Sequence, residues 1–231
     1  MKRSHIEISK MAVGERAVEF VRDGMILGLG TGTTVRYFIE KLAEKIKKES
    51  LEIIAIPTSI ETEKMADNLE IPLSNLNEYP EVDLDIDGAD EVDLNFNLIK
   101  GGGGAHTKEK IVAMASKEFI VIVDKTKTVD RIGNTPVPIE VLSFSENFVR
   151  KEIQKLGGIA RLREDFRTDN GNLILDVRFN IINPEKLEGD INNIPGVIEN
   201  GIFANRRPEK IIVADGKKVR IMERDLNGGK R

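Results

Sequence analysis

The chain has no cysteine and only two histidines among its 231 residues. The absence of cysteine excludes disulfides, a thiolate zinc site and a cysteine nucleophile, and it is typical of proteins from a reducing compartment. Two histidines argue against a histidine-based metal site. We therefore expect the cytoplasm as the location of this protein.

Long apolar runs and an excess of basic residues are also missing. The longest apolar stretches are only as long as a strand, so we expect no membrane span, and residues 1–10 lack the apolar core of a signal peptide. The net charge is −4 with mixed signs, which argues against nucleic-acid binding. Apolar residues make up 40% and charged residues 32%, a composition typical of a soluble globular protein.

Apolar segments alternate with amphipathic helical segments over the first part of the chain. Strands are predicted at 25–30, 51–57, 82–87 and 119–124, and helices at 6–21, 35–49 and 61–70. The segment 97–110 is predicted to hold the end of a strand, a glycine loop and the start of a helix. This alternation predicts a Rossmann-like, doubly wound parallel sheet, whose ligands bind at the carboxyl ends of the strands.

The pattern changes near residue 133. Segments between 137 and 203 follow the order β-α-β-β-α-β, which predicts a small ferredoxin-like α+β module, and 209–215 predicts a strand that returns to the first domain. We thus expect one α/β domain at 1–133 plus 208–231 and a smaller domain at 134–207. Residues 227–231 are expected to fray.

The segment GLGTGTT, residues 28–34, follows a strand and opens a helix, where backbone N–H groups can meet an anion. Thr33 occupies the place of the third glycine of a dinucleotide fingerprint, and the Gly-Lys-Ser/Thr of a Walker A loop is missing. Hydroxyl donors suited to a monophosphate come from Thr31, Thr33 and Thr34. A tight strand-to-helix turn with an ordinary cap is the alternative.

The segment VDLDIDGADEVDLN, residues 82–95, begins like a calcium-binding loop. Such a loop needs a bidentate glutamate at its twelfth position, where this chain has Leu94. The alternation of apolar and acidic residues instead predicts a strand. Asp87 and Asp90 should lie at its carboxyl edge, where a magnesium site stays open as an alternative. For the remaining carboxylates we expect a solvated acidic loop: Asp83, Asp85, Glu91 and Asp93.

The third segment, IKGGGGAHTKEK, has four consecutive glycines between Lys100 and Glu109. Such a run indicates a close backbone approach to a ligand or an unusual turn, and a flexible connection is the alternative. His106 could be catalytic, a helix cap or a bystander. Lys10 and Lys127 could each reach the strand ends, although composition alone favours solvated side chains for both.

These three motifs, in this order and spacing, closely resemble the type A family of ribose-5-phosphate isomerase. The resemblance covers nearly the whole chain, including VDKTK, TPVPIEV and the small second module. It implies a Rossmann-like domain without nucleotide plus a small α+β domain, a homodimer or homotetramer, and interconversion of ribose 5-phosphate and ribulose 5-phosphate without a metal or other cofactor.

The resemblance also implies roles for individual residues. Glu109 would be the proton acceptor, Asp87 and Asp90 would hold sugar hydroxyls and help open the ring, and Lys100 would stabilise the charged intermediate. The substrate-binding residues would be Thr31, Gly32, Thr33, Thr34, Asp87, Gly88, Ala89, Asp90, Lys100, Gly101, Gly102, Gly103, Lys127 and, as a weaker match, Lys10. The one departure is His106, where the family usually carries an aliphatic residue.

Two other kinds of function are alternatives. A sugar-phosphate deaminase or lactonase on a related scaffold would rely on a catalytic histidine, for which only His106 could serve. A sugar-phosphate-sensing domain of a transcriptional regulator would need a DNA-binding segment, and no basic helix-turn-helix pattern precedes Gly28. A sensor would also have no use for a base such as Glu109.

Overall fold

The chain folds into two compact units in the structure, a computed structural model that describes residues 4–225. The first unit contains the described residues up to Gly88, then Val112–Thr126 and those from Pro208 onward. The second contains Ala89–Ile111 and Lys127–Arg207. Residues 89–111 and 127–133, which we expected in the first domain, thus group with the second unit. The predicted fraying of 227–231 lies outside the described residues.

A six-stranded sheet forms the centre of the first unit, in the order β13-β12-β6-β3-β1-β2. All neighbouring strands are parallel except β12 and β13. The strands are β1 (Ile26–Leu29), β2 (Ile54–Pro57), β3 (Val82–Asp87), β6 (Ser116–Asp124), β12 (Lys210–Asp215) and β13 (Lys218–Glu223). The predicted α/β class is confirmed, and β13 is an additional antiparallel edge strand.

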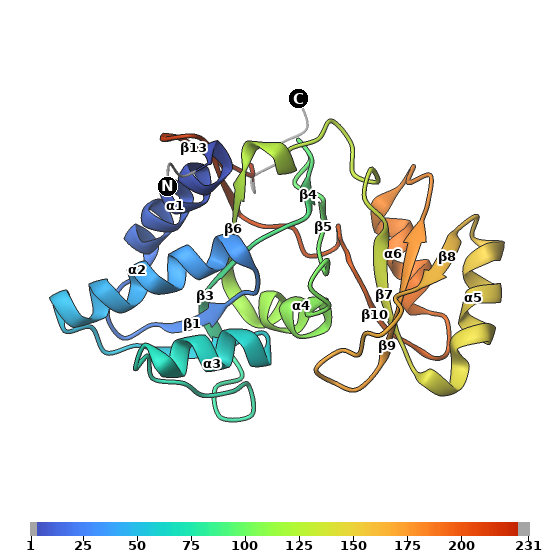
Figure 1. Ribbon diagram of the computed structural model, residues 1–231, viewed down its shortest axis with the longest axis horizontal. Coiled ribbons are helices and arrows are strands. Elements are labelled where there is room, and N and C mark those ends of the chain that lie inside the picture. The colour runs from blue at the N-terminus through green and yellow to red at the C-terminus, as the bar shows by residue number, and fades with distance from the viewer. Residues whose placement is uncertain (1–3, 226–231) are drawn as a thin grey trace. The chain divides into compact units, whose positions relative to one another are not determined.

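Helices pack on both faces of this sheet (Figure 1). On one face, α1 and α2 lie side by side and pack against Leu27 and Leu84. On the other face, α4 brings Val112 against the backbone of Gly28, where a Cβ atom would lie 2.6 Å from Val112. The helices that contribute to this unit are α1 (His5–Ala17), η1 (Val18–Phe20), α2 (Thr33–Glu49), α3 (Ile60–Asn68), α4 (His106–Ala115) and η2 (Lys125–Lys127).

Local sequence signals explain where these helices begin. Ser4 and Glu7 form a capping box at the start of α1, and the Ser59 hydroxyl accepts a hydrogen bond from the Thr62 N–H at the start of α3.

Between residues 4 and 225 no helix is both long and apolar enough to cross a membrane.

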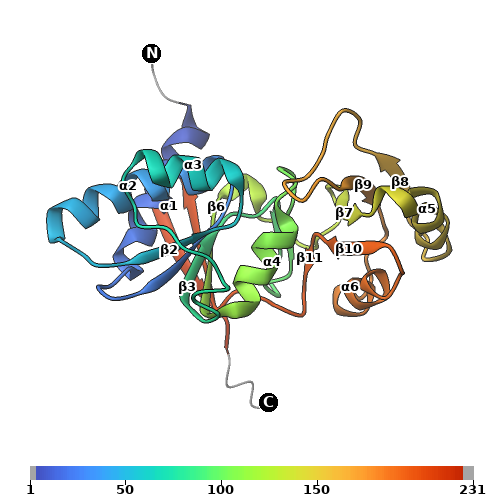
Figure 2. The ribbon, with the colours of Figure 1, turned by 90° about the horizontal axis from the view of Figure 1, so that it is seen from below.

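The second unit contains a four-stranded antiparallel sheet in the order β10-β7-β9-β8. Along the chain its elements follow the predicted order β-α-β-β-α-β, with α5 beside β8 and α6 beside β10 (Figure 2). The elements are β7 (Val137–Val141), η3 (Ser143–Ser145), α5 (Glu146–Lys155), β8 (Ile159–Leu162), β9 (Leu173–Arg178), α6 (Pro184–Asn192) and β10 (Val197–Asn200). The ferredoxin-like module is therefore confirmed.

A second small sheet in this unit was not predicted. It joins β4 (Glu91–Val92), β5 (Leu98–Ile99) and β11 (Ile202–Phe203) in antiparallel pairs, in the order β11-β5-β4. Because β11 follows the ferredoxin-like module along the chain, this pairing brings the segment after β3 into the second unit.

The expected solvation of the acidic loop is wrong for three of its four residues. Asp85, Glu91 and Asp93 are 0%, 2% and 4% exposed, and only Asp83 keeps a partly exposed side chain, which pairs with Lys117 at 2.8 Å. Alternation of apolar and acidic residues along a strand predicts exposed acidic side chains when one face of the sheet is open to water. Here α4 covers the face of β3 that carries Asp85.

The burial of Glu91 is compensated by backbone hydrogen bonds. Its carboxylate accepts from the N–H groups of Gly133 at 2.7 Å, of Asn134 at 3.2 Å and of Thr135. Charge-assisted hydrogen bonds of this kind offset much of the free energy needed to remove a carboxylate from water. Glu91 thus holds the segment that leads into β7.

His106, at the start of α4, is fully buried in the second unit. Its Nε2 atom lies 3.3 Å from the Glu199 carbonyl oxygen, and a Cβ atom on Gly101 would lie 2.7 Å from its Nδ1 atom. Burial lowers the pKa of the imidazole from its usual 6.5 to about 4, so the ring is neutral at pH 7. This environment is that of a core residue.

The pKa of His106 predicts a pH-dependent loss of stability. Because the folded pKa lies below the unfolded one, the stabilisation is complete above about pH 6.5 and is lost as the pH falls toward 4. Between pH 7.5 and 4.5 the free energy of unfolding should fall by about 2–3 kcal/mol more in the parent than in His106→Leu. Urea denaturation at both pH values measures this difference, since the carboxylates titrate in both proteins. Parallel losses would contradict the prediction.

Candidate active site

The first candidate feature is the loop between β1 and α2 in the first unit. Gly32 is the N-cap of α2 with φ 117°, a conformation that favours glycine, and Thr33 begins the helix. Gly32 and Thr33 are exposed and Thr34 is half-buried, so the positive end of α2 is accessible to an anion. The loop has the geometry expected of a phosphate site.

Lys10 lies at this loop, as its weaker match to the family pattern implied. Its Nζ atom donates a hydrogen bond of 2.6 Å from α1 to the Thr33 hydroxyl. An ammonium group beside a helix N-terminus adds a second source of positive potential. The arrangement therefore favours a dianionic ligand at the start of α2.

Thr31 is held by a cluster of hydroxyl groups that the sequence analysis missed. Its Oγ1 atom lies 2.8 Å from the hydroxyl oxygens of Thr58 and Ser59 and 3.2 Å from that of Thr62, while Thr62 donates to the Gly30 carbonyl at 2.8 Å. The available signal was the position of Thr58 and Ser59 directly after a parallel strand. This cluster fixes the β1 loop against the start of α3.

Asp87 ends β3 next to this loop, at the point where the strand order reverses between β1 and β3. It is fully buried, and its Oδ1 atom accepts from the N–H groups of Thr31 at 3.0 Å and Gly88 at 2.6 Å. A Cβ atom on Gly30 would lie 2.1 Å from the Asp87 carboxyl carbon. Only glycine at position 30 therefore lets the loop and the carboxylate come this close.

The second unit begins with Ala89 and Asp90, and Asp90 binds the glycine run. Its Oδ2 atom accepts from the Gly102 N–H at 2.7 Å, and its own N–H donates to the Ile99 carbonyl at 2.8 Å. A side chain at Gly102 would meet the carboxylate, since a Cβ atom there would lie 2.8 Å from Asp90 Oδ1. The turn and the glycine loop are thus one local structure.

The conformation of the glycine run also explains its composition. Gly101 and Gly104 have φ values of 97° and 81°, in the region that disfavours side chains. Gly102 and Gly103 are exposed, whereas Gly101 is buried against His106. Gly102 and Gly103 thus lie at the surface, and Asp90 holds the Gly102 N–H.

Lys100 and Glu109 form a buried ion pair in the second unit. Lys100 Nζ lies 3.3 Å from Glu109 Oε2, and the two residues are 2% and 4% exposed. Lys100 precedes the glycine run and Glu109 lies on α4 after it, so the loop folds back to bring them together. A carboxylate next to an ammonium group can accept a proton from a substrate whose resulting negative charge the ammonium stabilises.

The structure thus brings together four sets of predicted residues, each within one unit. They are Thr31 with Asp87, Lys10 with Thr33, Asp90 with Gly102, and Lys100 with Glu109. Lys127 lies in η2 with a half-buried side chain, and Gly88 and Ala89 are half-buried on either side of the boundary between the units. Within residues 4–225, no group of three or more His, Asp or Glu side chains is arranged to hold a metal ion.

Comparisons with known proteins agree with the sequence motifs. Residues 54–218 match the family described as ribose 5-phosphate isomerase A (phosphoriboisomerase A). Ribose-5-phosphate isomerase A of Methanococcus aeolicus is 48% identical over 92% of this chain and 93% of its own length. The enzyme of the same name from Bacillus mycoides is 50% identical over 88% of this chain and 94% of its own.

Solved structures of ribose 5-phosphate isomerases are similar to this chain over nearly its whole length. Ribose 5-phosphate isomerase A of Methanocaldococcus jannaschii superposes with a TM-score of 0.91 at 43% identity, covering 96% of this chain and 100% of that one. A D-ribose-5-phosphate isomerase in complex with phospho-erythronic acid also gives a TM-score of 0.91, at 41% identity and the same coverage. With the motifs and geometry described above, these matches show that the chain belongs to the ribose 5-phosphate isomerase A family.

Proposed function

We propose that this chain interconverts D-ribose 5-phosphate and D-ribulose 5-phosphate through a cis-enediolate, as an enzyme of the non-oxidative pentose phosphate pathway. Family membership supports the substrate and the reaction class. The observation that carries the mechanism is the buried pair in which Lys100 Nζ lies 3.3 Å from Glu109 Oε2. This pair supplies a base and a cation, the two groups that an aldose–ketose isomerisation requires.

Glu109 would move one proton between neighbouring carbons. The C2 proton of the open-chain aldose passes to the Glu109 carboxylate, the C2–H electron pair forms the C1–C2 double bond, and the carbonyl oxygen becomes an enediolate. A proton then passes from the C2 hydroxyl to the C1 oxyanion, and return of the carbon-bound proton from Glu109 to C1 on the same face leaves the C2 carbonyl of the ketose. One carboxylate suffices for both steps, and the exclusion of water around Glu109, which is 4% exposed, favours its action as a base.

Lys100 would stabilise the negative charge of the enediolate. Its ammonium is already fixed before the reaction by burial, and its backbone N–H donates to the Gly201 carbonyl at 2.9 Å. A cation held in place in a site with little water stabilises developing charge without further reorganisation.

The remaining family positions would bind the substrate. Asp87 and Asp90 would accept hydrogen bonds from sugar hydroxyls and help open the ring, since ionised carboxylates act only as acceptors. The phosphate would bind at the start of α2, where Lys10 already contacts Thr33. We assign substrate contacts to Thr31, Gly32, Thr33, Thr34, Gly88, Ala89, Gly101, Gly102, Gly103 and Lys127 as well.

The phospho-erythronic acid bound by one relative is a phosphorylated sugar acid. It has the phosphate and hydroxyl groups of the proposed substrate, and this supports a sugar-phosphate site. His106, in contrast, is fully buried and gives no support to a histidine-dependent deaminase or lactonase.

We further propose a cytoplasmic homodimer or homotetramer. The fully exposed Phe144 and the partly exposed Phe148 on the second unit support a subunit contact through that unit, because large exposed apolar side chains are often covered by a partner.

The activity itself is the first test. The purified chain should convert ribose 5-phosphate to ribulose 5-phosphate, and excess EDTA should leave the rate unchanged because proton transfer here needs only side chains. A coupled ketose assay with and without EDTA measures both. Absence of ribulose 5-phosphate would contradict the proposed function. Loss of activity in EDTA that magnesium restores would contradict the metal-free mechanism.

Substitution of the base should separate catalysis from binding. Glu109→Gln keeps the shape of the side chain but removes the base, so kcat should fall by about 10³-fold while KM changes little. Steady-state kinetics measures both constants, and Glu81→Gln, at an exposed position, is the matched control. Turnover close to that of the parent would assign the base to another residue.

Removal of the cation should lower kcat rather than raise KM. Lys100→Met retains most of the side-chain length and removes the ammonium, so we expect a loss of about 10²–10³ in kcat. Lys108→Met, on the same segment, controls for loss of a positive charge. A raised KM with unchanged kcat would instead make Lys100 a ground-state binding residue. Circular dichroism verifies that each variant is folded.

A further inference from the structure

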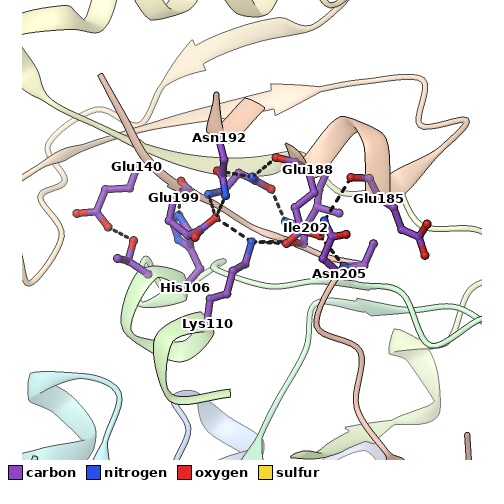
Figure 3. A network of polar contacts seen from close by, with 12 residues as sticks. His106, Lys110, Glu140, Glu185, Glu188, Asn192, Glu199, Ile202 and Asn205 are labelled. Atoms are coloured by element: carbon purple, nitrogen blue, oxygen red, sulfur yellow. Dashed lines mark hydrogen bonds and ion pairs between the residues drawn. The ribbon is translucent and has the colours of Figure 1, made fainter. Parts of the chain in front are cut away.

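Lys110 follows Glu109 on α4, but its side chain points into the second unit (Figure 3). It is 5% exposed, and its ammonium donates to Glu188 Oε1 at 2.9 Å, to Glu199 Oε1 at 2.8 Å and to the Ile202 carbonyl at 2.7 Å. An ammonium group has three donors, so all three are used. Successive helical residues point about 100° apart, so Lys110 can be anchored without occupying the side of the helix used by Glu109.

The acceptors of Lys110 are themselves fixed by hydrogen bonds. Glu188, on α6, accepts at Oε2 from the N–H groups of Ala204 at 2.9 Å and Asn205 at 2.8 Å. Glu199, on β10, accepts at Oε1 from Asn192 Nδ2 at 2.7 Å. Figure 3 shows these side chains converging on Lys110. The network therefore ties α4 to α6, β10 and β11 of the second unit.

The segment that anchors Lys110 also anchors Lys100. Ile202, whose carbonyl accepts from Lys110, pairs with the residue before Lys100 in the small sheet, and the Lys100 N–H donates to Gly201. The ring of Phe203 lies 4.8 Å from Lys110 Nζ and 5.5 Å from Lys100 Nζ. Strand β11 thus contacts both the strand that leads to Lys100 and the helix that carries Glu109.

Lateral contacts act on α4 in addition to the hydrogen bond by which Asp90 holds Gly102 in the glycine run. Four glycines precede its start, and glycine has the largest conformational freedom of any residue. A second anchor acts on the same turn, where the Thr107 hydroxyl donates to the fully buried Glu140. A displacement of about 1 Å at a catalytic group can lower the rate about 10²-fold, so an anchor at this turn has a direct consequence for Glu109.

We propose that Lys110 is a positioning residue. Its hydrogen bonds fix the first turns of α4 against β11 and thereby hold the Glu109 carboxylate next to Lys100. The inference rests on the proposed function of Glu109 and Lys100. It also gives the ferredoxin-like module a role, since α6 and β10 supply the two carboxylates that bind Lys110. Buried ion networks are seldom more stabilising than apolar packing of the same volume, and this favours a role in geometry over one in stability alone.

The test compares a charge-neutral replacement of the network with a matched core variant. Lys110→Met alone would leave two carboxylates without their cation, so the main variant combines Lys110→Met with Glu188→Gln and Glu199→Gln. We expect its kcat to fall about 30-fold or more, with KM within about threefold of the parent and the acid limb of the kcat–pH profile unmoved. The control is Ile153→Ala on α5, a buried residue outside the network. It should lower Tm while kcat stays within about twofold of the parent.

Each other outcome overturns the inference. A folded triple variant with kcat close to that of the parent would make the network purely structural. A shift of the acid limb by about one pH unit would make Lys110 an electrostatic partner of Glu109 rather than an anchor. A raised KM with unchanged kcat would make the network a determinant of binding.

Two further arms keep the test decisive. If the triple variant does not fold, Glu199→Gln, which retains the pair of Lys110 and Glu188, should lower kcat about 3–10-fold, and an unchanged kcat would overturn the inference. If the parent chain has no isomerase activity, both the proposed function and this inference are wrong. If the parent is active and the triple variant has the same kcat, only this inference is wrong.

Discussion

The proposed chemistry of this protein depends on one interaction, the buried ion pair of Lys100 and Glu109. Removing either charged group from water costs free energy, and the 3.3 Å separation between Lys100 Nζ and Glu109 Oε2 offsets part of that cost. The pair is built from two segments that the glycine run joins, so its geometry depends on what holds each segment. The small sheet holds Lys100 through Gly201, and the first turns of α4 hold Glu109.

The first unit obeys a different constraint, the close approach of backbone to carboxylate. Gly30 lets the β1 loop lie against Asp87, and the hydroxyl cluster around Thr31 fixes that loop against α3. The anion-accessible start of α2 follows directly in the chain. Both units therefore use the same device, in which a glycine-rich turn lies against an aspartate: Asp87 in the first and Asp90 in the second.

The long elements could be predicted because strands and helices of more than about four residues carry a clear periodicity. Strands β4, β5 and β11 contain two residues each, too few for any period, and their pairing could not be foreseen. The motifs gave the candidate residues, including the pair of Lys100 and Glu109. The burial of Asp85 was missed because alternation says nothing about a helix on the second face of a sheet. The hydroxyls of Thr58 and Ser59 and the anchor at Lys110 were missed because each depends on partners distant in sequence.

The distribution of the two histidines has a practical consequence for spectroscopy. His5 lies exposed on α1 of the first unit, beside Asp215, whereas His106 is sealed within the second. The chain has no other imidazole. A proton NMR spectrum of the ring C–H groups therefore contains one reporter for each unit, without any label. Because one ring is exposed to water and the other is enclosed in a core, the two rings have different surroundings, and the integrity of either unit can be followed independently in any variant.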